Sequence, residues 1–274
     1  MTHRAPNEYA LGHNHEELQR LIGQSRFLGE LTEELLRAAG IMPGMRVLDV
    51  GCGAGDVSFL AATLVGPQGS VVGVDRSAEA IALAKRRAAD VGLPNVSFVT
   101  QDLQELTTEA RFDAIVGRLV LMYFPQPDAL LRRLLLLLAP GGVAAFHEFD
   151  VHAATSEPHV PLFALSMARV SEALRCAHAQ PRMGLRLPQI FQQAQLPAPR
   201  TIAHARIGTG ADAAIFHQLA GITRTLLPVM EKHGIATATE VEVDTLAARL
   251  QQAVQSADAT VLGPLFIGAW AHKA

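Results

Sequence analysis

Three glycines at alternate positions carry the strongest chemical signal in this chain of 274 residues. Gly51, Gly53 and Gly55 follow the segment 46–50, which is typical of a buried parallel strand, and precede the segment 56–65, which is predicted to be a helix. Glycine adopts backbone angles that other residues avoid and lets a ligand approach the main chain. A strand, a glycine turn and a helix in this order would point backbone N–H groups at a bound ligand. Tight turns of this kind also occur for purely structural reasons, so the rest of the sequence must agree.

An acid ends the next predicted strand. Asp75 closes the apolar segment 70–75, 20 residues after Gly55. A carboxylate at that position can accept hydrogen bonds from both hydroxyls of a ribose. It could instead cap the following helix, because residues 77–81 have the pattern of a helix start. We favour ribose binding, given the glycine turn before it.

The spacing of the glycines distinguishes two kinds of nucleotide-binding turn. The dinucleotide fingerprint is GxGxxG, whereas this chain has GxGxG preceded by Asp49. With this spacing the sequence resembles the class I S-adenosylmethionine-dependent methyltransferases, in their small-molecule, ubiquinone-biosynthesis-type branch, over about residues 40–150. The resemblance implies S-adenosyl-L-methionine as the cofactor, with the glycine turn against its methionine and ribose parts. It also implies that Asp49 lies near the amino acid of the cofactor or orders the turn.

The same resemblance assigns adenine contacts to the residues after the predicted strand 95–99. Asp102 matches the acid that accepts a hydrogen bond from the adenine exocyclic amine, and Leu103 matches the apolar residue that packs on the ring. Arg76, beside Asp75, is included among the expected cofactor-binding residues. A solvated loop acid is the alternative for Asp102, and we consider it the weaker interpretation.

Three further residues are candidates for the cofactor site. Cys52 lies inside the turn and is expected to pack under the cofactor, since no cation or base stands beside it to form a thiolate. Tyr9 belongs to an aromatic segment that folds over the cofactor in some relatives, and plain packing is an equal alternative. Arg118 follows the predicted strand 112–117 and should face the ligand crevice. It could pair with the methionine carboxylate, with an acidic substrate, or in a surface ion pair.

The densest cluster of titratable groups follows the predicted strand 143–146. His147 is the first candidate for a general base, and Glu148 is a second base or the residue that orients a substrate group. Neighbouring residues on a strand point to opposite faces, so only one of them should see the acceptor. The alternative is a packing histidine and a surface glutamate. Methyl transfer rests chiefly on positioning, which can supply about 7–11 kcal/mol of barrier reduction, and a carbon nucleophile would need no base.

The order of the predicted elements indicates an α/β fold. We expect a Rossmann-like, seven-stranded, mostly parallel sheet of order 3-2-1-4-5-7-6, with helices on both faces and helical lid insertions. An N-terminal helical arm or lid is expected at 1–40, a cofactor-binding core at 41–150, and completion of the sheet with substrate-covering helices at 151–274. One helix is expected over 127–138, and 259–272 should form a final antiparallel strand at the sheet edge.

Composition restricts the partners and the compartment. The formal net charge of −3 and the pI of about 6.4 disfavour a nucleic-acid substrate. The longest dense apolar run, 134–139, is too short to span a bilayer, and the N-terminus lacks the apolar core of a signal peptide. We therefore expect a cytoplasmic protein without a membrane partner. Two cysteines and scattered histidines predict neither a disulfide framework nor a metal site.

These observations predict methyl transfer to a small, fairly hydrophobic acceptor, as O-, N- or C-methylation in secondary or quinone-type metabolism. A homodimer through the added helices is one option for the assembly. An NAD-dependent oxidoreductase would share the ribose-binding acid, although the glycine spacing speaks against it. A cyclase or rearrangement catalyst that binds S-adenosylmethionine without methylating is a second alternative, kept open by Arg118 and the pair His147–Glu148.

Overall fold

The computed structural model of the chain describes residues 28–274. Residues 28–38 form a helix, which we call the N-terminal helix. The other elements, in chain order, are β1 (Arg46–Val50), α2 (Asp56–Val65), β2 (Ser70–Asp75), α3 (Ala78–Val91), β3 (Val96–Thr100), β4 (Phe112–Arg118), η1 (Leu121–Tyr123), α4 (Pro127–Leu134), β5 (Leu138–Asp150), η2 (Val151–Ala153), β6 (Thr155–Glu157), α5 (Pro161–Cys176), α6 (Met183–Gln193), β7 (Arg200–His204), β8 (Ile207–Gly208), α7 (Ala213–Lys232), α8 (Ala238–Val241), α9 (Val243–Ser256), β9 (Thr260–Leu262) and β10 (Leu265–His272).

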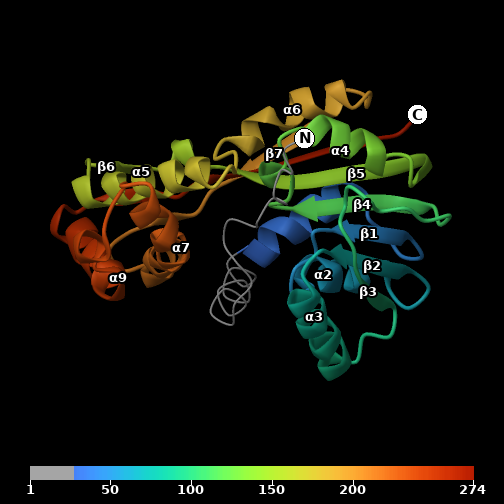
Figure 1. Ribbon diagram of the computed structural model, residues 1–274, viewed down its shortest axis with the longest axis horizontal. Helices are drawn as coiled ribbons and strands as arrows, with labels where there is room; N and C mark the ends of the chain where they lie inside the picture. The colour runs from blue at the N-terminus through green and yellow to red at the C-terminus, as the bar shows by residue number, and fades with distance from the viewer. Residues whose placement is uncertain (1–27) are drawn as a thin grey trace, which may run out of the picture.

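Seven strands form one sheet in the order β3-β2-β1-β4-β5-β10-β7 (Figure 1). The first five of these are parallel, and β10 runs antiparallel to both of its neighbours, β5 and β7. Counted within this sheet alone, the order is 3-2-1-4-5-7-6. The chain labels differ because β6, β9 and β8 form a separate sheet that the sequence did not predict. The predicted α/β fold class is confirmed.

Helices cover both faces of the seven-stranded sheet. The N-terminal helix and α2 pack on one face, where Leu35, Ala145 and Trp270 belong to one buried cluster. α4 and α6 pack on the other face, where Phe146 meets Phe191 edge-to-face with 6.2 Å between the ring centroids. The side chains of β5 thus alternate between the two faces, as the pleat of a strand requires.

The helices α5, α7, α8 and α9, with the small sheet β6-β9-β8, form a helical module at one end of the large sheet, at the left of Figure 1. α7 packs against both α5 and α9, and Phe163, Phe216 and Leu250 are buried between them. The module lies within residues 151–274, where the sequence predicts substrate-covering helices. The division of the chain into three regions stays a prediction. No helix within residues 28–274 is both long and apolar enough to cross a bilayer.

The leucine-rich segment after α4 differs from the predicted single helix. α4 ends at Leu134, and β5 already begins at Leu138. Most of these leucines are buried, as they would also be in a longer helix. Their pattern therefore does not show where α4 ends. The segment Pro140–Gly142 lies within β5, where Gly141 has a φ of +75° and the register with β4 shifts. It is therefore an irregularity of the strand rather than a connection before it.

The C-terminal strand β10 pairs antiparallel as predicted, but it does not lie at the sheet edge. β7 pairs on its outer side and forms the edge instead. Pro264 lies between β9 and β10, so the residue that lacks an N–H group stands outside both ladders.

Candidate functional site

The glycine turn joins β1 to α2 at the carboxyl end of the central strand. Gly51, Gly53 and Gly55 have φ angles of +66°, +52° and +90°, a region that residues with side chains rarely adopt. The N–H groups of Gly51 and Cys52 donate to a carbonyl oxygen of β2 at 2.8 and 3.0 Å, and Gly53 N–H donates to Asp75 Oδ2 at 2.9 Å. These donors are used within the protein, whereas the sequence predicted that they point at a ligand. The turn therefore offers a close backbone surface rather than an anion-binding site.

Asp75 ends β2 and connects the turn to the next helix. Its Oδ2 accepts from Gly53 N–H, and its Oδ1 accepts from Ser77 N–H at 2.8 Å. Ser77 is the N-cap of α3, with its Oγ accepting from Ala80 N–H at 3.1 Å, so the capping alternative for Asp75 is wrong. Each carboxylate oxygen keeps a second lone pair, which leaves two acceptor positions for a ligand. Asp75 and its neighbour Arg76 both line the cavity described below.

Asp49 lies beneath the turn and is 1% exposed. Its Oδ2 accepts from Ser58 Oγ at 2.6 Å, and its Oδ1 has no hydrogen-bond partner within residues 28–274. Burial raises the pKa of Asp49 to about 7, which the hydrogen bond from Ser58 and the charge of Arg118 oppose. Because Asp49 does not line the cavity, its geometry fits the ordering of the turn better than direct contact with a cofactor.

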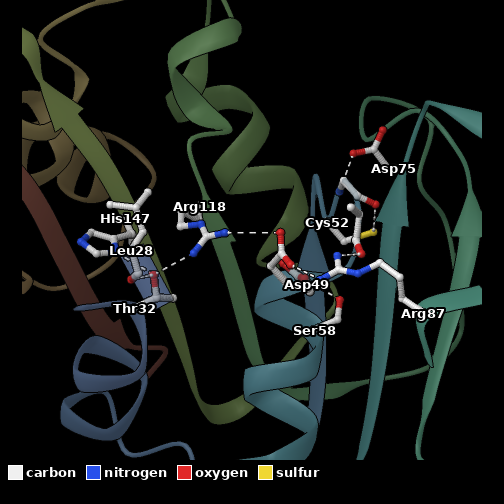
Figure 2. Close-up of polar contacts among 12 residues, drawn as sticks. Leu28, Thr32, Asp49, Cys52, Ser58, Asp75, Arg87, Arg118 and His147 are labelled. Carbon is white, nitrogen blue, oxygen red and sulfur yellow. Dashed lines mark hydrogen bonds and ion pairs between the residues drawn. The ribbon is translucent and has the colours of Figure 1, made fainter. Parts of the chain in front are cut away.

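Arg118 ends β4, and its side chain lies between the N-terminal helix and α2 (Figure 2). Its Nη1 donates to Thr32 Oγ1 at 3.1 Å, and its Nη2 is 4.0 Å from Asp56 Oδ2. Asp56, the first residue of α2, pairs through its other oxygen with Arg87 at 2.7 Å. The Arg118 side chain is 9% exposed, and burial lowers its pKa, so the surface ion pair is wrong. A buried cation with one distant carboxylate partner thus lines the cavity.

The thiol of Cys52 packs in an apolar cluster with Ile81 and Phe98. Burial raises the pKa of Cys52 far above its usual range, and the charges of Asp49 and Asp75 add to that rise. The thiol therefore stays protonated and cannot act as a nucleophile at neutral pH. This geometry agrees with the small packing residue expected in the turn.

Asp102 and Leu103 lie in the loop after β3, and both line the cavity. Asp102 Oδ1 accepts from Gln104 N–H at 2.7 Å, which orders the loop. Leu103 is 6% exposed and belongs to the main apolar core. The structure thus brings the predicted adenine contacts to the same space as Asp75 and the glycine turn.

One cavity of about 1340 Å³ connects the glycine turn with the helical module. Its turn half is lined by polar and backbone groups, namely Gly51–Ala54, Asp56, Val57, Asp75, Arg76, Asp102–Glu105 and Arg118. Its module half is lined mainly by apolar side chains of α5 and α7, namely Phe163, Met167, Val170, Leu174, Ile215, Leu219 and Ile222. The loop 119–125, with Phe149 and Phe266, lies between the two halves. Small-molecule sites usually measure about 300–1,000 Å³, so this cavity has room for two ligands side by side.

His147 and Glu148 differ from the predicted arrangement, because neither lines the cavity. His147 lies under the N-terminal helix, with Nδ1 3.5 Å from Thr32 Oγ1 and its ring edge-on to Phe266 at 4.8 Å between centroids. Burial lowers the pKa of His147 to about 3, so its ring is neutral at pH 7. Glu148 is buried on the opposite face, not exposed, and binds backbone N–H groups of the loop 119–125. A general-base role for either residue stays a prediction that the cavity lining does not support.

Two residues that shape the turn half were missed in the sequence, and one prediction lies outside the described residues. Asp56 directly follows the third glycine, where an acid favours a helix N-terminus, and that position was a usable signal. Thr32 carries no signal, because its contact with Arg118 exists only once the N-terminal helix packs on β4. Tyr9 precedes residue 28, so its cofactor contact stays a prediction.

Comparison with protein families agrees with this geometry. A family model described as a methyltransferase domain matches residues 41–195, which is more than half of the chain. The family model and the fold identify a class I S-adenosylmethionine-dependent methyltransferase. The chain belongs to this methyltransferase domain family.

Two relatives and one solved structure show how far the similarity extends. The arsenite methyltransferase of Aquipseudomonas alcaligenes is 38% identical over 126 residues, which are 43% of this chain and 36% of the relative. The demethylmenaquinone methyltransferase of Listeria monocytogenes serotype 4a is 28% identical over 204 residues, which are 67% of this chain and 82% of the relative. The match therefore spans about a third of the length of the first relative. The YcgJ protein of Bacillus subtilis shares the fold, with a TM-score of 0.57 at 19% identity over 89% of this chain and all of its own.

S-Adenosylmethionine is the cofactor of this class, and the turn half fits it better than a dinucleotide. A pyrophosphate needs free N–H donors at a helix N-terminus. Here the N–H groups of Gly51, Cys52 and Gly53 already have partners. The carboxylate of Asp56 also stands at the first position of α2, where it would repel a phosphate. The buried guanidinium of Arg118 suits the carboxylate of an amino acid, which the nicotinamide cofactors lack.

Proposed function

We propose that the protein transfers a methyl group from S-adenosylmethionine to a small, fairly apolar acceptor bound in the module half of the cavity. The single observation that carries the proposal is one continuous cavity with Asp75 and Asp102 on one wall and mostly apolar side chains of α5 and α7 on the other. Methyl transfer requires donor and acceptor side by side with water removed, and positioning of this kind can supply about 7–11 kcal/mol.

Residues of the turn half would hold the cofactor by three kinds of contact. Asp75 would accept the ribose hydroxyls on its two remaining acceptor positions. Asp102 and Leu103 would contact the adenine, and Arg118 would pair with the methionine carboxylate in preference to Asp56, which lies 4.0 Å away. When bound, S-adenosylmethionine supplies a methyl group already activated by its sulfonium, so no side chain has to be modified covalently.

The module half favours an organic acceptor over a metalloid. Aromatic side chains are prominent around it, since Tyr123, Phe149, Phe163 and Phe266 line the cavity, and they favour a planar apolar molecule. Arsenite, named in one relative, is a soft centre that prefers thiolate ligands. Residues 28–274 hold no group of three metal-binding side chains, and Cys52 stays protonated.

Acid–base help, for an acceptor that needs it, would come from the loop 119–125 rather than from β5. Tyr123 lines the cavity on this loop, between the two halves, whereas His147 and Glu148 do not. We therefore place Tyr123 ahead of the two β5 residues as the candidate for proton transfer. An acceptor that reacts through carbon or is already ionised would need none of the three.

Two measurements test the proposed function. Calorimetry with S-adenosylhomocysteine should give a dissociation constant of about 1–100 μM, typical of a small ligand held by a few directed contacts. Transfer of labelled methyl from S-adenosylmethionine should be detected with at least one acceptor from a panel of quinols, polycyclic phenols and arsenite. Failure to bind S-adenosylhomocysteine would refute the proposal. Binding without product from any class of acceptor would favour the non-methylating cyclase or rearrangement catalyst.

The proposal extends to the partners and the compartment. We place the protein in the cytoplasm without a nucleic-acid partner, supported by a net charge of −3 that offers no basic surplus for phosphates. A homodimer through the helical module would have a mass of 2 × 29.3 = 58.6 kDa. Light scattering of the full chain distinguishes that mass from the 29.3 kDa of a monomer.

A further inference from the structure

We propose that Glu148 is a positioning residue whose carboxylate fixes the loop 119–125 between the two halves of the cavity. The inference rests on the proposed function, because this loop walls the proposed reaction space. Glu148 lies on β5 and is 0% exposed. Its Oε1 accepts from Val120 N–H at 2.9 Å and from Leu121 N–H at 2.7 Å. One oxygen thus binds two successive backbone donors of the loop.

The loop needs these contacts because of how it leaves β4. Leu119 has a φ of +57°, which is uncommon for a residue with a side chain. Its N–H donates to His147 O at 2.9 Å, and the next two N–H groups turn toward β5. Buried backbone donors without partners are strongly disfavoured. Glu148 satisfies both of these donors, so it stabilises a backbone conformation that the sequence of the loop does not favour by itself.

The loop contacts both halves of the cavity. A Cβ atom at Gly51 would lie 2.5 Å from Val120 Cγ2, so the side chain of Val120 rests directly on the glycine turn. Met122 O accepts from Gln180 N–H at 2.8 Å, in the connection between α5 and α6. Val120 and Met122 also line the cavity. A segment held by one carboxylate therefore contacts the turn half and the base of the helical module.

A purely space-filling role does not explain an ionisable group at this position. Burial of a carboxylate is unfavourable unless hydrogen bonds compensate it. Burial raises the pKa of Glu148 to about 8, and the backbone N–H groups of residues 120–122 oppose that rise. Phe146, which faces the same side of β5, is apolar. The two hydrogen bonds from the loop explain why position 148 holds a hydrogen-bond acceptor rather than an apolar side chain.

Three substitutions of Glu148 distinguish the acceptor oxygen from the ionisable proton and from the length of the side chain. Glu148→Gln keeps an acceptor oxygen, Glu148→Asp withdraws it by one methylene, and Glu148→Ala removes it. Asp150→Asn is the matched control, because Asp150 is a buried acid on the same strand that binds His152 N–H and Arg182 instead of the loop. The readouts are amide hydrogen exchange of residues 119–124 and the affinity for S-adenosylhomocysteine, both on the full chain.

The expected pattern is specific to the acceptor. Glu148→Ala and Glu148→Asp should speed exchange at Val120 and Leu121 at least tenfold and weaken S-adenosylhomocysteine binding at least fivefold. Glu148→Gln and Asp150→Asn should stay within twofold of the wild type in both readouts.

Three results would overturn the proposal: wild-type exchange in Glu148→Asp, a Gln variant as impaired as the shortened one, or an equal effect in Asp150→Asn. Should Glu148→Ala fail to fold, the Asp and Gln variants decide between these outcomes. If the wild type does not bind S-adenosylhomocysteine, the proposed function fails, while exchange still tests the loop contact because it needs no ligand.

Discussion

The turn half and the module half of the cavity are held in place by different kinds of interaction. In the turn half, directed bonds fix each polar group: Asp75 holds the N–H groups of Gly53 and Ser77, and Thr32 holds Arg118. In the module half, the lining side chains that α5 and α7 supply are mostly apolar, with Gln218 and Lys232 of α7 among them, and the packing of α5 against α7 holds them. Directed bonds thus fix the wall at which we propose that the cofactor binds. Packing and shape dominate the wall at which we propose that the acceptor binds.

Buried charge is distributed in the same unequal way. Asp49, Asp56 and Arg118 lie around the glycine turn and are all nearly inaccessible to water. Such groups are sensitive to pH and to substitution, because their charged forms depend on nearby partners. The apolar wall should respond instead to changes in side-chain volume.

The largest effect is expected from Asp75→Ala. The variant removes the acceptor of Gly53 N–H and the proposed acceptor of two ribose hydroxyls, and hydrogen bonds to charged groups contribute about 1.5–3 kcal/mol each. The affinity for S-adenosylhomocysteine should fall about 100-fold, measured by calorimetry on a variant whose circular dichroism shows it folded. Asp75→Asn, which keeps one acceptor oxygen, should fall in between. An Ala variant that binds within threefold of the wild type would take Asp75 out of the cofactor site.

A second test addresses the packing of the glycine turn. Gly51→Ala places a Cβ 2.5 Å from Val120 Cγ2 on a backbone with φ +66° and should lower the free energy of unfolding by about 2–3 kcal/mol. Gly92→Ala is the control. Gly92 has nearly the same φ, +65°, but a Cβ added there would meet no atom within 4 Å. Its expected cost is about 1 kcal/mol. Urea denaturation compares the two. Equal losses would mean that Val120 moves aside freely.

The turn half could be predicted from the sequence because its signals are local. Gly51, Gly53, Gly55 and Asp75 stand at the ends of adjacent strands, and a parallel sheet brings those ends together. Residues whose role depends on packing between distant segments could not be assigned. Glu148 matched the pattern of an exposed base, yet the pleat of β5 turns it toward the loop 119–125.

The same limit applies to the fold. The central strands β1 and β2 of the seven-stranded sheet are apolar runs next to a glycine, which makes them visible in the sequence. The sheet β6-β9-β8 consists of strands of two or three residues, and no periodicity marks them. Its pairs join segments about fifty and about a hundred positions apart. The helix α4 ends at Leu134 within an apolar run. A helix and a strand would both bury that run, so the sequence does not show where the helix ends.

A third test uses the pH dependence of stability to measure the contribution of Glu148. The folded pKa of Glu148 is about 8 against an ordinary 4.5, so between these values the unfolded chain loses a proton that the folded chain keeps. Stability contributed by Glu148 therefore falls as pH rises and levels off above about 8. The opposite effect of His147 ends near its ordinary value of 6.5, and the effect of Asp49 ends near 7. Between pH 7 and 8 the free energy of unfolding should fall by about 1 kcal/mol in the wild type.

Glu148→Gln has no proton to release and should lose most of this fall over the same interval in urea denaturation, which leaves the smaller contribution of Asp49. Asp150→Asn, on the same strand, should keep the wild-type slope. A Gln variant as steep as the wild type would assign the slope to another group.

The smallest expected effect lies in the module half, where Met167→Ala enlarges the cavity. Met167 of α5 lines the apolar wall and is 8% exposed, so under the proposed function the variant removes contacts with the acceptor and leaves those with the cofactor. The KM for the acceptor should rise three- to tenfold, equivalent to about 1 kcal/mol, while the affinity for S-adenosylhomocysteine stays within twofold. Leu165→Ala on the same helix is the control, because Leu165 is 47% exposed and does not line the cavity. If S-adenosylhomocysteine binding weakened as much as acceptor binding in Met167→Ala, the two walls would act as one unit. The contrast between directed bonds and shape would then fail.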